Sequence, residues 1–203
     1  MTEVLAYIDG FNLYHGLREK HGRRYLWLDL EMLVRRLLRQ GQVLSGVKYF
    51  TASVRNDPPA LARQNAYIGA LRTATSVEVV RGRFQEKRVS CRSCRTTWTT
   101  YAEKETDVNI AVTLVEDSAL QRYDTALVVS ADSDLCPAVR SAKRLHSASN
   151  IVVAFPPKRH SDELKKAADG AFTIGDAVIR QSQLPGTVTD GRGAVYTRPP
   201  TWK

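Results

Sequence analysis

Acidic residues at two places far apart in the chain have the types and positions of metal ligands. Asp9 ends the apolar run 4–8, and Asp132 and Asp134 follow a second apolar run, 125–130. A carboxylate at the end of a buried strand costs free energy unless a cation or hydrogen-bond donors satisfy it. Taken alone, Asp9 is more simply interpreted as the cap of the following helix. The second acidic strand end shifts the interpretation toward a shared ligand site.

The ligand types indicate which chemistry such a site could perform. Several carboxylates cannot all be ionised within a few ångströms of one another unless positive charge lies among them. Oxygen ligands without histidine or cysteine suit Mg²⁺ or Mn²⁺ rather than zinc. A hard cation held in this way can activate water and stabilise displacement at a phosphate, with two ions ~3.5–4 Å apart in the two-metal form. In a basic protein, the acidic positions therefore favour a nuclease.

The elements that must position these carboxylates alternate along the chain. The sequence predicts strands at 4–8, 47–54, 77–80, 125–130 and 151–155, with a short sixth strand at 171–174. Between them it predicts helices at 11–19, 28–38, 60–73, 106–115, 137–145 and 162–168. This alternation indicates an α/β fold with a parallel sheet and right-handed crossovers.

The expected strand order brings the acidic positions together. In the doubly wound order 3-2-1-4-5, strands 1 and 4 are neighbours at the topological switch point, where ligands bind. Asp9, Asp132 and Asp134 should then face one crevice. Asp107 lies in the first turn of the helix that leads into strand 4, and it could face the same crevice.

The segment 81–101 departs from this alternation, and we interpret it as a β-hairpin insertion. Its strand-like residues surround a central Cys91-Arg92-Ser93-Cys94. Arginine, lysine and aromatic residues are interleaved in it: Arg81, Arg83, Lys87, Arg88, Arg92 and Arg95 with Phe84, Trp98 and Tyr101. Such a mixture suits single-stranded RNA, with phosphates on the arginines and bases on the rings. The alternative is a hairpin whose rings pack on the domain and whose arginines are solvated.

Cys91 and Cys94 have the spacing of half a zinc site, whereas zinc wants four ligands. The chain has no second CxxC pair, and Cys136 is more simply a buried thiol in a helix. Three states stay open: zinc shared across a homodimer, a local disulfide, and two reduced thiols. We favour reduced thiols over zinc.

Composition sets the broad class of the protein. With 203 residues, 43% of them hydrophobic, the chain can build one α/β core. We expect a nuclease-like domain at 1–182 and a C-terminal tail without periodicity at 183–203. A formal charge of +9 favours a polyanionic partner. The absence of a bilayer-length apolar run and of a signal peptide, together with three cysteines, predicts a cytoplasmic protein with no membrane contact.

Three blocks of the sequence resemble the signature blocks of NYN domains. They are Tyr7-Ile8-Asp9-Gly10-Phe11-Asn12-Leu13-Tyr14, Lys104-Glu105-Thr106-Asp107 and Val129-Ser130-Ala131-Asp132-Ser133-Asp134-Leu135. NYN domains belong to the PIN-like nuclease superfamily, and this chain resembles their bacterial LabA/DUF88-like branch over about residues 3–175. The resemblance implies a PIN-like Rossmannoid fold, a three-layer sandwich, with metal-dependent ribonuclease activity.

The resemblance also implies roles for individual residues. The implied metal ligands are Asp9, Asp107, Asp132 and Asp134. Asn12 would position substrate or a metal-bound water, and Lys104 would contact phosphate. Ala131 departs from the family, in which glycine is more common at that place.

The sequence analysis therefore predicts a ribonuclease that uses Mg²⁺ or Mn²⁺ and cuts single-stranded or structured RNA endonucleolytically. The main alternative is a non-catalytic RNA-binding module or regulatory protein that retains the fold. A phosphoacceptor domain is disfavoured, because the third strand leads into Arg81-Gly82 rather than into an acceptor aspartate. A protein partner bound by the basic hairpin is the remaining alternative.

Overall fold

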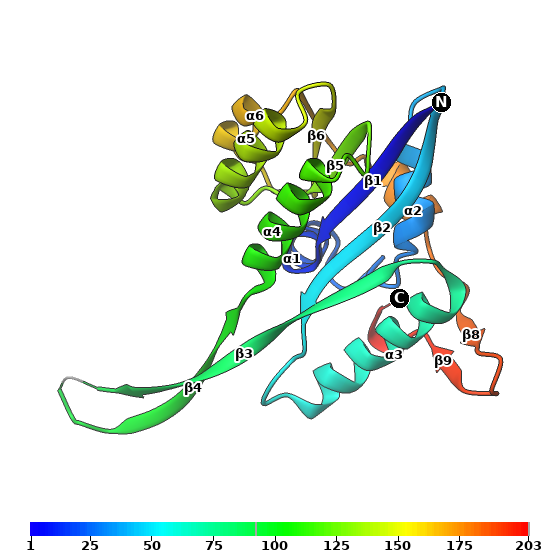
Figure 1. The fold of residues 1–203 in the computed structure, drawn as a ribbon. Helices are drawn as coiled ribbons and strands as arrows, with labels where there is room; N and C mark the ends of the chain where they lie inside the picture. Colours follow the sequence, from blue (N-terminus) through cyan, green and yellow to red (C-terminus); the bar gives the residue numbers. More distant parts are fainter. Residues whose placement is uncertain (92, 203) are drawn as a thin grey trace.

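A computed structural model of the chain describes residues 1–91 and 93–202, and within β3 and β4 it leaves the side chains of residues 83–88 and 99–104 undescribed. Seven strands form one sheet in the order β4-β3-β2-β1-β5-β6-β7 (Figure 1). Their bounds are Thr2–Asp9 (β1), Gln42–Ala52 (β2), Glu78–Ser90 (β3), Thr97–Lys104 (β4), Thr125–Val129 (β5), Asn150–Phe155 (β6) and Gly170–Thr173 (β7). The predicted order 3-2-1-4-5 is confirmed, because the predicted strands 4 and 5 are β5 and β6.

The sheet is parallel from β3 through β7, and β1 lies at its centre. β1 pairs with β2 on one side and with β5 on the other, and Ile8 lies opposite Val129 in register. The neighbouring carboxyl ends of β1 and β5 form the topological switch point predicted from the sequence. Asp9 ends β1 at this point.

Helices cover both faces of the sheet. Their bounds are Gly10–His21 (α1), Leu30–Leu37 (α2), Pro58–Ala74 (α3), Thr106–Ala119 (α4), Cys136–Leu145 (α5), Asp162–Ala167 (α6) and Asp176–Gln181 (α7), with short 3₁₀ turns at Ser133–Leu135 (η1) and Pro200–Trp202 (η2). None of the helices in the described part of the chain combines the length and apolar composition needed to cross a bilayer.

Alternating side chains of β1 explain the three layers. Val4, Ala6 and Ile8 pack into a core with α1, α2, α3 and α7. Leu5 and Tyr7, which point the other way, pack into a second core with α4, α5 and α6. Because both faces are buried, the strand is a continuous apolar run rather than an alternating one. The predicted three-layer sandwich is confirmed.

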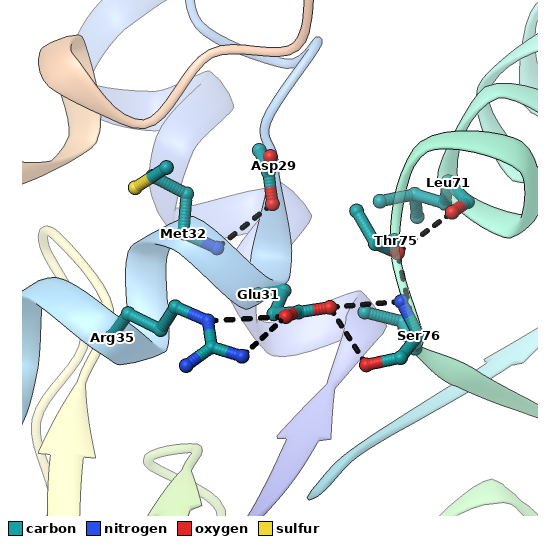
Figure 2. A network of polar contacts seen from close by, with 8 residues as sticks. Asp29, Glu31, Met32, Arg35, Leu71, Thr75 and Ser76 are labelled. Carbon is teal, nitrogen blue, oxygen red and sulfur yellow. Dashed lines mark hydrogen bonds and ion pairs between the residues drawn. The ribbon is translucent and has the colours of Figure 1, made fainter. Parts of the chain in front are cut away.

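Helix α2 is fixed by two carboxylates at its start (Figure 2). Asp29 Oδ1 accepts a hydrogen bond of 2.8 Å from the amide of Met32 and thereby caps the helix. Glu31 binds Arg35 on its own helix at 2.7 Å and accepts from the Ser76 hydroxyl at 2.7 Å. Asp29 is an ordinary capping aspartate, and it serves below as a reference for Asp9.

The predicted hairpin insertion is confirmed, but its first strand is continuous with the third strand of the sheet. β3 runs to Ser90, and β4 returns antiparallel to it, with Ser90 opposite Thr97 in register. Figure 1 shows the β3–β4 ribbon projecting from the body of the domain, away from α5 and α6. Its tip, between Ser90 and Thr97, carries the cysteine pair.

The segment from Gln183 has more structure than its composition suggested. Thr187–Thr189 (β8) and Val195–Thr197 (β9) form a small antiparallel pair that contacts α3. A methyl group on Gly69 of α3 would lie only 2.1 Å from Cε1 of Tyr196, so the ring lies directly on the helix. Trp202 is buried against Trp27 and Tyr67. The tail is therefore part of the core on this face.

Candidate metal centre

Asp9 lies buried at the carboxyl end of β1, with 3% of its surface exposed. Its Oδ1 accepts a hydrogen bond of 2.9 Å from the amide of Asn12, so the residue caps α1 as the simpler interpretation of the sequence predicted. Its Oδ2 accepts a hydrogen bond of 2.8 Å from the hydroxyl of Ser130. The second oxygen thus faces the strand end across the switch point. Asp9 therefore both caps α1 and contributes to the candidate site.

Ser130 connects Asp9 to Asp132. It is fully buried directly after β5, and its Oγ accepts a hydrogen bond of 3.0 Å from the amide of Asp132 while donating to Asp9. The single hydroxyl thereby fixes the turn that carries Asp132 relative to the end of β1. The sequence analysis gave Ser130 no role. The sequence feature that could have indicated this role is a hydroxyl residue at the end of an apolar run, two positions before an aspartate.

Asn12 fixes the same turn from the other side. Its Oδ1 accepts a hydrogen bond of 3.1 Å from the amide of Ala131. The side-chain oxygen is therefore engaged by the protein, and the amide NH₂ is the part that could donate to a bound group. Ala131 does not have a positive φ, so this turn does not require the glycine that is more common in the family.

The electrostatic surroundings of Asp9 differ from those of a second buried carboxylate, Asp117. Asp117 is fully buried, and it accepts hydrogen bonds from Lys48 Nζ at 2.7 Å and from Arg122 Nη1 at 2.9 Å. Tyr7 donates to it as well, at 2.8 Å. Two cations thus stabilise its charge, as expected of a buried structural carboxylate.

Asp9 has only neutral donors among the described residues, and no lysine or arginine of that part of the chain pairs with it. Burial raises the pKa of the Asp9 carboxyl, the hydrogen bonds from Asn12 and Ser130 lower it, and the Asp132 carboxylate raises it again. The last effect shows that the two carboxylates are close enough to repel each other. A bound cation would relieve both burial and repulsion.

The other predicted ligands lie around this pair. Asp134 is exposed in η1, and its amide donates a hydrogen bond of 2.9 Å to Asp132 Oδ1. Asp107 is half-buried in the first turn of α4. Within the described residues, no three histidine, cysteine, aspartate or glutamate side chains are placed to hold a metal ion together. Asp9 and Asp132 alone still fit a hard cation, since Mg²⁺ is commonly held by one or two carboxylates with water and substrate phosphates.

A basic groove begins at this acidic turn. It has a volume of about 890 Å³ and lies between η1, α5 and α6, which contact one another; α5 and α6 are side by side in Figure 1. Four cations line it, together with the carboxylates of Asp134 and Glu163: Arg140, Lys143, Arg144 and Lys166. Lys143 pairs with Asp169 at 2.6 Å, whereas Arg140 is exposed. The sequence analysis missed this groove because its cations come from two helices.

The predicted RNA contacts lie on the projecting hairpin. Arg81, Arg95 and Trp98 are exposed, with 49% of the Trp98 surface accessible, so the ring does not pack on the domain. The side chains of Arg83, Arg88 and Lys104 and the whole of Arg92 lie outside the described residues. The hairpin therefore presents an aromatic ring and at least two cations to solvent.

The cysteine pair lies in the turn at the tip of this hairpin. Cys91, Cys94 and Cys136 are free thiols. The amide of Cys91 donates to the carbonyl of Thr96 at 2.8 Å, and a hydrogen bond of 3.2 Å joins Cys94 Sγ to Thr96 Oγ1. Hydrogen bonds from Thr96, and then from Cys91, lower the pKa of the Cys94 thiol to about 7.

A separate cavity of about 380 Å³ lies beside the start of α1, lined by residues of α1, β2, α3 and the C-terminal segment. Gly10, which follows Asp9, is part of its wall, as are Tyr49 of β2 and Trp202 of the C-terminal segment. Aromatic side chains and arginines line it together. The sequence analysis did not predict this cavity.

Comparisons with known proteins agree with this architecture. The family model for the NYN domain matches residues 3–175. The chain is 27% identical, over 236 aligned residues, to the 6-hydroxy-3-succinoylpyridine 3-monooxygenase HspA of Pseudomonas putida, with 97% of this chain and 74% of that protein covered. Its fold resembles the crystal structure of a protein of unknown function from Vibrio parahaemolyticus, with a TM-score of 0.56, 19% identity, and coverage of 91% of this chain and 96% of that one.

Proposed function

The chain belongs to the NYN domain family of the PIN-like superfamily, which points to a nuclease-like, RNA-related function, and from this premise we propose that it is a metal-dependent ribonuclease. It hydrolyses phosphodiester bonds of single-stranded or structured RNA endonucleolytically, using Mg²⁺ or Mn²⁺. The observation that carries the proposal is the pair Asp9 and Asp132. Both are held at the switch point by Ser130, and no described cation of the protein neutralises Asp9.

Each residue of the centre has a distinct part in the proposed reaction. Asp9 and Asp132 hold the ion, which when bound supplies an acidified water and charge stabilisation at the phosphate. Asp107, in the first turn of α4, and Asp134, whose amide donates to Asp132 Oδ1, would complete the site once RNA phosphate is present. Asn12 keeps the turn 131–134 against α1 through its side-chain oxygen, and its NH₂ group orients the substrate.

The positive surfaces suit an RNA chain on either side of the carboxylates. The groove beside Asp134 presents exposed cations for phosphates. The hairpin presents Arg81, Arg95 and Trp98, and the Trp98 ring can stack on an unpaired base. Lys104, whose side chain lies outside the described residues, is proposed as a further phosphate contact.

The test is cleavage of labelled single-stranded RNA with Mn²⁺ or Mg²⁺ by the wild type, Asp9→Asn and Asp132→Asn. Asparagine retains an oxygen that can cap α1, so Asp9→Asn should fold. The matched control is Asp29→Asn, which makes the same substitution at a helix cap of α2 (Figure 2). We expect loss of cleavage by about 100-fold or more in the two site variants, because each removes a ligand charge, and wild-type activity in the control.

Equal cleavage by all four proteins would contradict the proposal. RNA binding without metal-dependent cleavage across varied substrates would instead support the non-catalytic RNA-binding module. In that case affinity would still fall with salt, because phosphate contacts release counterions.

A second candidate function is favoured by the cavity beside Asp9. The Pseudomonas putida relative is named for a reaction on a pyridine that carries a succinoyl chain. A cavity lined by aromatic rings and arginines suits such a heteroaromatic acid. Loss of 6-hydroxy-3-succinoylpyridine in the presence of oxygen and a nicotinamide reductant, followed by liquid chromatography, tests this candidate.

A further inference from the structure

The cavity beside the carboxylates has the size of a small-ligand site. Its volume of about 380 Å³ lies at the lower end of the range of roughly 300–1,000 Å³ that is usual for such sites. Its walls come from α1, the end of β2, the start of α3 and the C-terminal segment. Residues of the segments 23–28 and 54–57 complete the walls.

Aromatic rings packed edge-on against one another form one wall of the cavity. Tyr67 packs edge-on against Tyr49, with ring centroids 6.4 Å apart, and against Trp202 at 5.9 Å. The Tyr67 hydroxyl donates a hydrogen bond of 2.8 Å to the carbonyl of Leu28, which fixes its ring. Fixed rings bind a flat apolar group at a small cost in conformational entropy.

The charged side chains that line the cavity are mainly positive. Arg18, Arg23 and Arg63 line the cavity together with one carboxylate, Asp57. Asp57 is engaged as the cap of α3, where it accepts from the amide of Ala60 at 2.9 Å. In the described part of the chain, the three arginines form no ion pair within 4.0 Å. They are therefore available to an anionic group, which guanidinium binds with charge-assisted hydrogen bonds.

The cavity and the metal centre share the turn after β1. Gly10 follows Asp9 and lines the cavity, and a methyl group on it would lie 2.9 Å from the Tyr49 hydroxyl. Asp9 is near enough to that hydroxyl to add to the effect of burial, which raises the Tyr49 pKa to about 12. A ligand in the cavity thus lies beside Gly10, the residue that follows Asp9.

We propose that this cavity binds a flat heteroaromatic ring carrying an acidic group, with the ring against Tyr49, Tyr67 and Trp202 and the acid on Arg63 and Arg18. A nucleotide of the RNA substrate is the source that fits the proposed ribonuclease, and this part of the inference rests on that function. A small heteroaromatic acid has the same chemistry, and the experiment separates the two sources.

The experiment measures ligand binding calorimetrically, at low salt with EDTA, so that no hydrolysis contributes. Uridine monophosphate supplies ring and acid, uridine the ring alone, and ribose 5-phosphate the acid alone, while nicotinate supplies ring and acid without a nucleotide. We expect uridine monophosphate to bind at least about tenfold more tightly than uridine or ribose 5-phosphate, because each of these lacks one of the two interactions.

Two variants locate the binding site. Arg63→Gln and Arg18→Gln should each weaken binding of uridine monophosphate by about tenfold, the effect of losing one charge-assisted hydrogen bond. Arg72→Gln is the matched control, since Arg72 is exposed on the same helix as Arg63 but does not line the cavity. It should bind as the wild type does.

Every outcome decides the proposal. Binding of nicotinate without uridine monophosphate supports a heteroaromatic acid site and overturns its nucleotide source. The proposal is overturned if nothing binds, or if uridine or ribose 5-phosphate binds as tightly as uridine monophosphate. Equal losses in Arg63→Gln and Arg72→Gln overturn it as well. A protein that binds uridine monophosphate but never cleaves RNA retains this site and contradicts only the ribonuclease, and the converse result contradicts only the site.

Discussion

The hydroxyl of Ser130 donates a hydrogen bond of 2.8 Å to Asp9 Oδ2, joining the end of β5 to the end of β1. Through the same oxygen Ser130 accepts from the amide of Asp132 at 3.0 Å. The two carboxylates are thus held on neighbouring strands by one buried group. Because of this hydrogen bond, Asp9 is both the cap of α1 and part of a candidate metal centre.

Substitution of Ser130 should therefore affect both stability and metal binding. Ser130→Ala leaves the buried Asp9 Oδ2 and the Asp132 amide without their common partner, which should lower the free energy of unfolding by ~1–3 kcal/mol. Because the hydroxyl orients both carboxylates, Mn²⁺ affinity should fall by roughly 10–100-fold. Denaturant unfolding and calorimetric Mn²⁺ titration measure the two effects.

The control for this variant is Ser118→Ala. Ser118 is equally buried, and its hydroxyl donates a hydrogen bond of 2.6 Å to the carbonyl of Ala142, between α4 and α5. It should lose stability to a similar extent but retain Mn²⁺ affinity. An equal loss of metal affinity in both variants would mean that Ser130 acts only through general stability.

The groove beside Asp134 should contribute to RNA affinity through charge. Arg140→Ala removes an exposed cation from it, so single-stranded RNA binding should weaken and the slope of log affinity against log salt should decrease by about 0.7 if one phosphate contact is lost. Arg72→Ala removes an exposed arginine of α3, outside the groove. Filter binding over a salt series measures both slopes. Equal changes in Arg140→Ala and Arg72→Ala would contradict the prediction that the groove binds RNA phosphates.

The thiol of Cys94 should be reactive near neutral pH. Hydrogen bonds from Thr96 and Cys91 lower its pKa to about 7, so the thiolate forms as the pH rises through that value. Alkylation by iodoacetamide, followed by peptide mass spectrometry, should show a midpoint near pH 7 at Cys94. Thr96→Val, which removes the hydroxyl, should move the midpoint upward.

Cys136 is the internal control, because burial raises its pKa and it should react slowly. A Cys94 midpoint unchanged by Thr96→Val would contradict the role of that hydrogen bond.

The sheet could be predicted because its central strands are buried on both faces. That burial makes 4–8 and 125–130 continuous apolar runs, and the acidic residues that end them stand out against the apolar background. The strand order then follows from general rules for parallel sheets. Asp9 and Asp132 could be brought together on that basis alone.

Features that depend on contacts between distant segments could not be predicted. The tail lacks periodicity, yet Tyr196 lies on Gly69 and Trp202 lies in the aromatic cluster, since these contacts require a glycine and rings more than a hundred residues away. The cavity depends on that docking. The bridging role of Ser130 likewise appears only when β1 and β5 are side by side.

The most direct test of the metal centre is a crystal structure of the protein with Mn²⁺, using the anomalous signal of the ion. The ribonuclease proposal predicts an anomalous peak between the carboxylates of Asp9 and Asp132. The same peak should be present in Asp29→Asn and absent from Asp9→Asn. Wild-type crystals grown with Mn²⁺ in which no ion lies against Asp9 and Asp132, or in which Asp9→Asn retains the peak, would contradict it.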